Sequence, residues 1–86
     1  MTGRNGKPSV IRPVVYQETI SQYRIVNDAV GMGKALIEHC DQADPDYLSA
    51  AAAIIAFAEG RGNPERARAN FIRAMTAAGV FVRQDD

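Results

Sequence analysis

The spacing of apolar residues changes after the first third of the chain. β-Branched and aromatic residues crowd residues 10–17 and 22–26, and a short polar connection separates the two runs. This pattern predicts two short strands that pair as an antiparallel hairpin. Pro13 interrupts the first run, so that strand either begins at or after Pro13 or lies at a sheet edge.

Three helices are predicted after the hairpin. Asn27 or Asp28 can cap the first, whose expected core face recurs at steps of three and four residues. That face consists of Ala29, Met32, Gly33, Leu36, Ile37 and Cys40. Asp44-Pro45 and Asn63-Pro64 each combine a capping side chain with proline at the first helical position, so helices are expected from Pro45 to Glu59 and from Pro64 to Gly79.

The helix over residues 45–59 is apolar on nearly every side. One stripe contains Leu48, Ala51, Ala52 and Ile55, while Ala50, Ala53 and Phe57 lie on another side with Ile54 between them. A helix of this kind is normally buried all round. Ile54 and Phe57 therefore mark it as a candidate core helix or a candidate dimer interface.

Residues 80–82 predict a short third strand, since Val80, Phe81 and Val82 follow the helix-ending Gly79. The expected fold class is α+β: a hairpin plus a short C-terminal strand packed against three helices, in the order ββαααβ. A flexible tail is expected over residues 1–9, one domain over 10–83 and a C-terminal tail over 84–86.

Composition favours a single small globular domain with little room for a large core. The chain has 86 residues, of which 47% are hydrophobic and 23% charged, and its ten basic and ten acidic residues cancel. Arg4, Lys7 and Arg12 nevertheless give the N-terminal segment an excess of positive charge. This basic arm is either a contact for an anionic partner or a solvated terminus.

The single cysteine, Cys40, excludes an internal disulfide bond. Residues 1–11 contain no apolar run of the kind found in secretory signals. The longest apolar stretch, residues 50–58, is shorter than the roughly 20 residues that a membrane span requires. A cytoplasmic location is therefore expected, with no membrane association.

Two motifs that suggest phosphate or dinucleotide binding are incomplete. Gly31-Met32-Gly33-Lys34 ends like a Walker loop, but Asp28 replaces its first glycine and Ala35 its hydroxyl residue. Leu36 replaces the third glycine of the dinucleotide pattern. Glycine packing within a helix is the better interpretation.

His39 and Cys40 raise the possibilities of a nucleophile–base pair and of a metal site. Neighbouring helical residues point about 100° apart, which disfavours the pair. His39, Cys40, Asp41 and Asp44 could ligate a metal, but structural zinc normally requires four nitrogen or sulfur ligands. Asp44 and Asp46 resemble an acid–base pair, although helix capping explains them more simply. No catalytic, cofactor-binding or metal-binding residue is assigned.

The third helix carries the best candidate recognition surface. Arg66, Asn70 and Arg73 share one stripe, with Arg61 and Arg68 nearby. Guanidinium groups bind phosphates and carboxylates, but a solvated helix face explains the stripe more simply. Three aromatic residues could stack nucleic-acid bases on the sheet, although core packing is the simpler account of them: Tyr16, Tyr23 and Phe81.

The C-terminal half is similar to an uncharacterised family. Residues 63–74, Asn-Pro-Glu-Arg-Ala-Arg-Ala-Asn-Phe-Ile-Arg-Ala, and residues 77–82, Ala-Ala-Gly-Val-Phe-Val, resemble the small alphaproteobacterial domain of unknown function numbered nine-eight-two. The resemblance extends over residues 12–82 and includes the early Pro13-Val14. It implies an α+β fold, with Arg68 holding a helix end or loop and Phe71 in the core, and it supplies no activity that could be carried over to this chain.

The sequence therefore favours a non-enzymatic protein-interaction or regulatory module, with a homodimer as one form. A nucleic-acid-associated regulator, using the basic arm and the arginine stripe, is one alternative. A small-molecule binder with a pocket between sheet and helices is the other.

Overall fold

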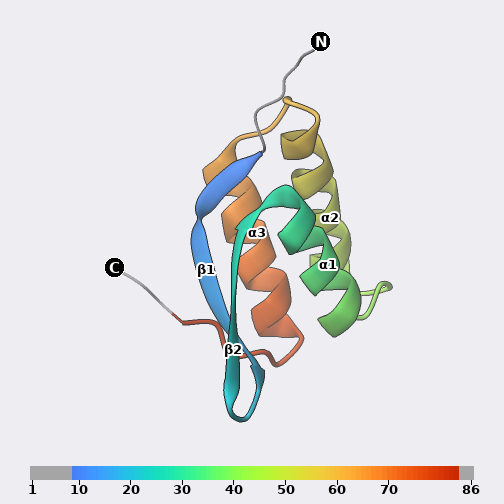
Figure 1. Cartoon of the computed structure of the whole chain (residues 1–86). Helices are drawn as coiled ribbons and strands as arrows, with labels where there is room; N and C mark the ends of the chain where they lie inside the picture. Colours follow the sequence, from blue (N-terminus) through green and yellow to red (C-terminus); the bar gives the residue numbers. More distant parts are fainter. Residues whose placement is uncertain (1–8, 84–86) are drawn as a thin grey trace.

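The computed structural model describes residues 9–83 as a hairpin covered on one side by three helices (Figure 1). Strands β1 (Val10–Thr19) and β2 (Gln22–Asp28) are followed by helices α1 (Ala29–His39), α2 (Pro45–Ala58) and α3 (Pro64–Ala77). Helices α1 and α3 contact the strands, and α2 packs against those two helices. The α+β class and the order ββααα are as predicted.

The two strands pair antiparallel, with Tyr16 opposite Arg24 and Val14 opposite Val26. The register is irregular between Val10 and Val14, the interval that contains Pro13. Proline has no N–H to donate to a ladder, so it is confined to edges and bulges. The strand begins before Pro13, and the expected edge position is the one observed.

The third strand predicted over residues 80–82 is not formed. Val82 instead makes one antiparallel bridge to Tyr16 on the free side of β1. Two backbone bonds flank it, Gln17 N–H to Phe81 O at 2.9 Å and Arg83 N–H to Val15 O at 2.8 Å. Helix α3 runs to Ala77, and Gly79 then turns the backbone at φ 87° before the segment reaches β1.

Each helix begins at a side-chain cap. Asp28 accepts a hydrogen bond from Gly31 N–H, Asp44 from Asp46 N–H, and Asn63 from the N–H groups of Glu65 and Arg66. The sequence alone allowed either Asn27 or Asp28 as the N-cap of the first helix, and Asp28 is the residue that caps α1. These three caps satisfy backbone donors that a helix cannot pair internally.

The core lies between the hairpin and the helices, centred on α3. Phe71 and Met75 of α3 are fully buried, as are Tyr16 of β1 and Met32 of α1. Ile54 and Phe57 are buried by their own chain, which makes them core residues. The predicted core face of α1 was wrong at Ile37, which is 60% exposed. Ala35, not predicted there, is buried instead.

Arg68 joins α3 to the hairpin. Its Nε donates to the carbonyl of Arg12 at 3.0 Å, and its Nη2 donates to the carbonyl of Pro13 at 3.1 Å. These acceptors lie where the β1–β2 register is irregular. The family resemblance implied structural roles for Arg68 and Phe71. Arg68 indeed has one, although it holds a strand, and Phe71 lies in the core.

Replacing Arg68 by lysine tests this attachment. Arg68→Lys keeps the charge but cannot span both carbonyls, so the free energy of unfolding should fall by about 1–2 kcal/mol. Arg66→Lys on the same helix is the control and should change it by less than about 0.5 kcal/mol. Urea unfolding measures both, and equal losses in the two variants would contradict the attachment.

Candidate functional site

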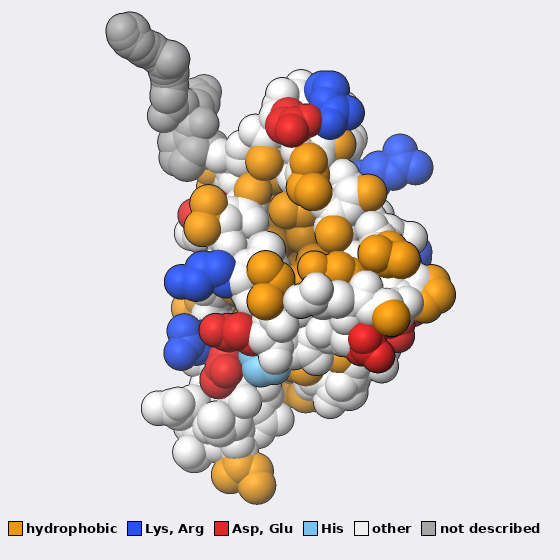
Figure 2. Space-filling model, turned by 90° about the vertical axis from the view of Figure 1, so that its right-hand side faces the viewer, with side chains coloured by type: hydrophobic (Ala, Val, Ile, Leu, Met, Phe, Trp, Pro, Cys, Tyr) orange, Lys and Arg blue, Asp and Glu red, His pale blue; other side chains and the backbone are white. Residues whose placement is uncertain are grey.

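Four large aliphatic side chains are exposed along α1 and α2. Val30 is 71% exposed and Ile37 60% on α1, while Leu48 is 56% and Ile55 54% exposed on α2. Figure 2 shows apolar side chains gathered over this side of the molecule, with charged groups at its margins. These four residues, with the groove between them, are called the α1–α2 face below. Large contiguous apolar patches on a small protein mark interaction sites.

A shallow apolar groove of about 190 Å³ runs between the two helices. Gly33 and Ile37 line it from α1, and Tyr47, Ala51 and Ile55 line it from α2. Small residues thus lie between the larger exposed side chains. Such a surface allows the backbone of a partner helix to approach closely.

Gly31 and Gly33 of α1 serve different purposes. A Cβ on Gly31 would lie 3.0 Å from Asp28 Oδ1 and 3.3 Å from a Val26 methyl, so its own chain requires the small residue. A Cβ on Gly33 would meet nothing within 4 Å. Glycine inside a helix costs about 1 kcal/mol relative to alanine. Among the described residues, no packing contact offsets that cost at Gly33.

A polar cluster joins the end of α1 to the hairpin. His39 Nε2 lies 3.3 Å from Glu18 Oε2 and 3.9 Å from Glu38 Oε1, at ion-pair distance but without hydrogen-bond geometry to either. Arg24 Nε lies 3.1 Å from Glu18 Oε1, and the Tyr16 hydroxyl donates to that oxygen at 3.2 Å. The Tyr16 and His39 rings pack edge to face at 5.4 Å. The Glu18 carboxylate therefore has three side-chain partners, one each from β1, β2 and α1.

Glu18, Glu38 and His39 could each offer a ligand atom to a metal ion, since those atoms lie within 4.8 Å of one another. Arg24 already balances the charge of Glu18. A cation here would therefore compete with Arg24 for Glu18, and the cluster is best described as an ion-pair network centred on Glu18. Sequence inspection missed it because Glu18 is far from His39 along the chain.

The four residues weighed as possible metal ligands, His39, Cys40, Asp41 and Asp44, are not brought together as one site. Cys40 Sγ donates to Ala74 O at 3.6 Å, Asp41 accepts from Ala43 N–H, and Asp44 caps α2. Burial, and then the nearby Asp44 charge, raise the pKa of the Cys40 thiol. A protonated thiol bonded to a backbone carbonyl is a poor nucleophile.

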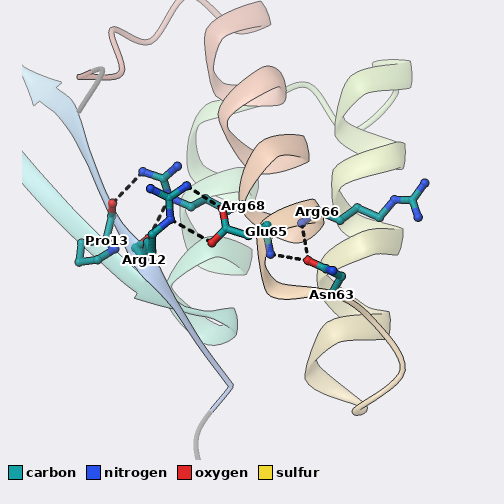
Figure 3. A network of polar contacts seen from close by, with 6 residues as sticks. All are labelled: Arg12, Pro13, Asn63, Glu65, Arg66 and Arg68. Atoms are coloured by element: carbon teal, nitrogen blue, oxygen red, sulfur yellow. Dashed lines mark hydrogen bonds and ion pairs between the residues drawn. The ribbon is translucent and has the colours of Figure 1, made fainter. Parts of the chain in front are cut away.

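The arginines around α3 divide into structural members and solvent-facing ones. Figure 3 shows Arg12, Glu65 and Arg68 joining β1 to α3, with Arg12 Nη2 2.6 Å from Glu65 Oε1. The hydrogen bond from Arg12 lowers the pKa of the Glu65 carboxyl.

The predicted surface of Arg66, Asn70 and Arg73 is only partly available. Asn70 donates to the carbonyl of Arg66 at 2.9 Å. Within residues 9–83, neither Arg66 nor Arg73 forms an ion pair. Arg61 is paired with Glu59, so the exposed positive charge is sparse. Arg4 and Lys7 of the expected basic arm lie outside the described residues.

The three aromatic residues of the possible stacking platform are not equivalent. Tyr16 is 2% exposed and belongs to the core, whereas Tyr23 is 54% and Phe81 57% exposed. Core packing was the simpler expectation for all three, and it holds only for Tyr16. The buried ring cannot stack a base, so these three residues do not form a platform.

No helix within residues 9–83 combines the length and apolar character needed to cross a bilayer. No protein-family model matches the chain, and no curated protein or solved structure matches it. The similarity of residues 12–82 to an uncharacterised family therefore stays a prediction.

The Tyr16 environment gives a prediction for alkaline titration. Burial is the largest cause that raises the pKa of the Tyr16 hydroxyl to about 12, followed by the Glu18 charge and hydrogen bond. Subtracting the absorbance titration of Tyr16→Phe from that of the parent should leave one ionisation near pH 12. Glu18→Gln should lower this midpoint but keep it above about 10, because burial remains.

Glu38→Gln is the matched control, since Glu38 contributes least to the shift. The unfolded tyrosine ionises near pH 10, below the folded midpoint, so the free energy of unfolding should fall between about pH 10 and 12. A Tyr16 midpoint near 10 in the folded parent would contradict the described environment.

Proposed function

We propose that the chain is a non-enzymatic protein-interaction or regulatory module that buries the α1–α2 face against another protein. A second copy of the chain is one such partner. The observation that carries this proposal is Gly33. It lies in the groove, its missing side chain serves no packing among the described residues, and exposed Ile37 and Ile55 line the same groove.

The apolar residues supply the driving force for such an association. Burying a Val, Leu or Ile side chain contributes about 1.5–3 kcal/mol relative to leaving it exposed. Four of them are more than half exposed on the α1–α2 face. A partner that covers the face can therefore offset much of the entropy lost on binding.

The chemistry of the polar residues supports binding over catalysis. Cys40 is bonded to a carbonyl, His39 faces Glu18 within an ion-pair network, and Asp44 caps a helix. These groups act on the chain's own structure. A cytoplasmic location is part of the proposal, because a lone protonated thiol is typical of proteins kept reduced.

Site-specific photo-crosslinking tests the proposal. A photoreactive residue at position 55, in the chain expressed in its own host, should give a crosslinked protein product. The same residue at position 20 is the matched control, since Ile20 is 93% exposed in the turn between β1 and β2, and the tip of this hairpin extends past the ends of the helices (Figure 1). Gly33→Leu fills the groove and should reduce the product at position 55 at least about tenfold.

The fold should survive these changes. Gly33→Ala is expected to raise the free energy of unfolding by about 0.5–1 kcal/mol, because the helix gains propensity and the Cβ meets open space. Equal crosslinking at positions 55 and 20, or a yield unaffected by Gly33→Leu, would rule out the α1–α2 face as the binding surface.

A further inference from the structure

We infer that the partner of the α1–α2 face is a second copy of this chain, packed about a two-fold axis with α1 antiparallel to α1 and α2 antiparallel to α2. This inference rests on the proposed function and names its partner. Three observations support it: the order of large and small side chains on α2, the charged residues at the edge of α1, and the size of the face.

The exposed residues of α2 can pack against the same residues of a second α2 helix that runs antiparallel to it. Leu48, Ala52 and Ile55 follow one another at steps of four and three residues along its outer side. An antiparallel copy centred near residues 51 and 52 places Leu48 of each chain beside Ile55 of the other. The alanines then meet at the crossing, where small side chains let helix axes come close.

The charged residues on the exposed side of α1 favour the same antiparallel arrangement. Lys34 and Glu38 are exposed and one helical turn apart, and Lys34 forms no ion pair among the described residues. In an antiparallel α1 pair centred near residue 36, Lys34 of each chain lies opposite Glu38 of the other, which gives two ion pairs at the rim. The alternative packing sets α1 on the α2 of the second copy. Residues 47–58 of α2 carry no charge, so Lys34 would then lack a partner.

The size of the face suits a reversible dimer. Helix α2 has 14 residues and α1 has 11, so the pair covers a footprint of about 20 Å by 20 Å. A standard stable interface buries about 800 Å² of accessible surface per partner, roughly 15% of the 5418 Å² that this chain exposes. The footprint is about 400 Å², roughly half of that standard figure, so we expect a small, reversible interface with a dissociation constant of roughly micromolar order.

Sedimentation equilibrium of the full chain, from about 1 to 500 μM, tests the partner. The parent should pass from monomer to dimer across this range. Gly33→Leu should weaken dimerisation at least about tenfold, while Ile20→Asp at the hairpin tip should leave it unchanged. Circular dichroism checks that each variant is folded.

Charge reversal tests the arrangement. Lys34→Glu and Glu38→Lys should each weaken the dimer on the order of three- to tenfold. The double variant should restore it, because the exchanged charges at positions 34 and 38 again face each other as opposites across the two-fold axis. Raising the salt concentration should weaken the parent dimer. Single variants with no effect, or a double variant that is not restored, would overturn the antiparallel packing.

The two proposals can fail separately. A chain that stays monomeric at the highest concentration, yet still crosslinks at position 55 to a different protein, would overturn the second-copy inference and leave the proposed function standing. Loss of position-specific crosslinking to any protein would remove both.

Discussion

An isolated two-stranded hairpin is at best marginally stable in water, so this fold depends on the packing of its helices against the hairpin. Helix α3 packs against β1, and its Phe71 and Met75 are buried in the same hydrophobic cluster as Tyr16 and Val14 of the strand. Arg68 adds hydrogen bonds to the strand's carbonyls where its register is irregular, and Val82 bridges its free side. Without α3, the hairpin would lose the apolar surface that covers β1.

Covering the hairpin leaves α2 with a surplus of apolar surface. Helix α2 turns Ala50, Ile54 and Phe57 inward, which suffices to pack it on α1 and α3. Its other apolar side chains, Leu48 and Ile55, face outward beside Ile37 of α1. A chain of this size has too little interior to enclose every apolar residue, so the remainder forms a surface. The α1–α2 face follows from this geometry.

The reactive side chains of the protein mostly serve its own architecture. His39 and Glu18 tie the end of α1 to the hairpin, Cys40 bonds to α3, and the three capping side chains begin the helices. Arg12 and Arg68 attach β1 to α3. Arg66 and Arg73 of α3 form no ion pair within the part of the chain that the structure describes.

Local structure could be predicted from the amino-acid sequence alone. Helix starts at Pro45 and Pro64, turns at Gly60 and Gly79 and the two strands follow from capping, proline geometry and β-propensity, which act over a few residues. Three-dimensional packing decided which apolar stripe of α2 is buried, that Ile37 faces outward, and that Glu18 meets His39. Those outcomes depend on how whole helices rotate and pack against each other. Because α2 is apolar on nearly every side, its sequence alone does not determine which side its neighbours will cover.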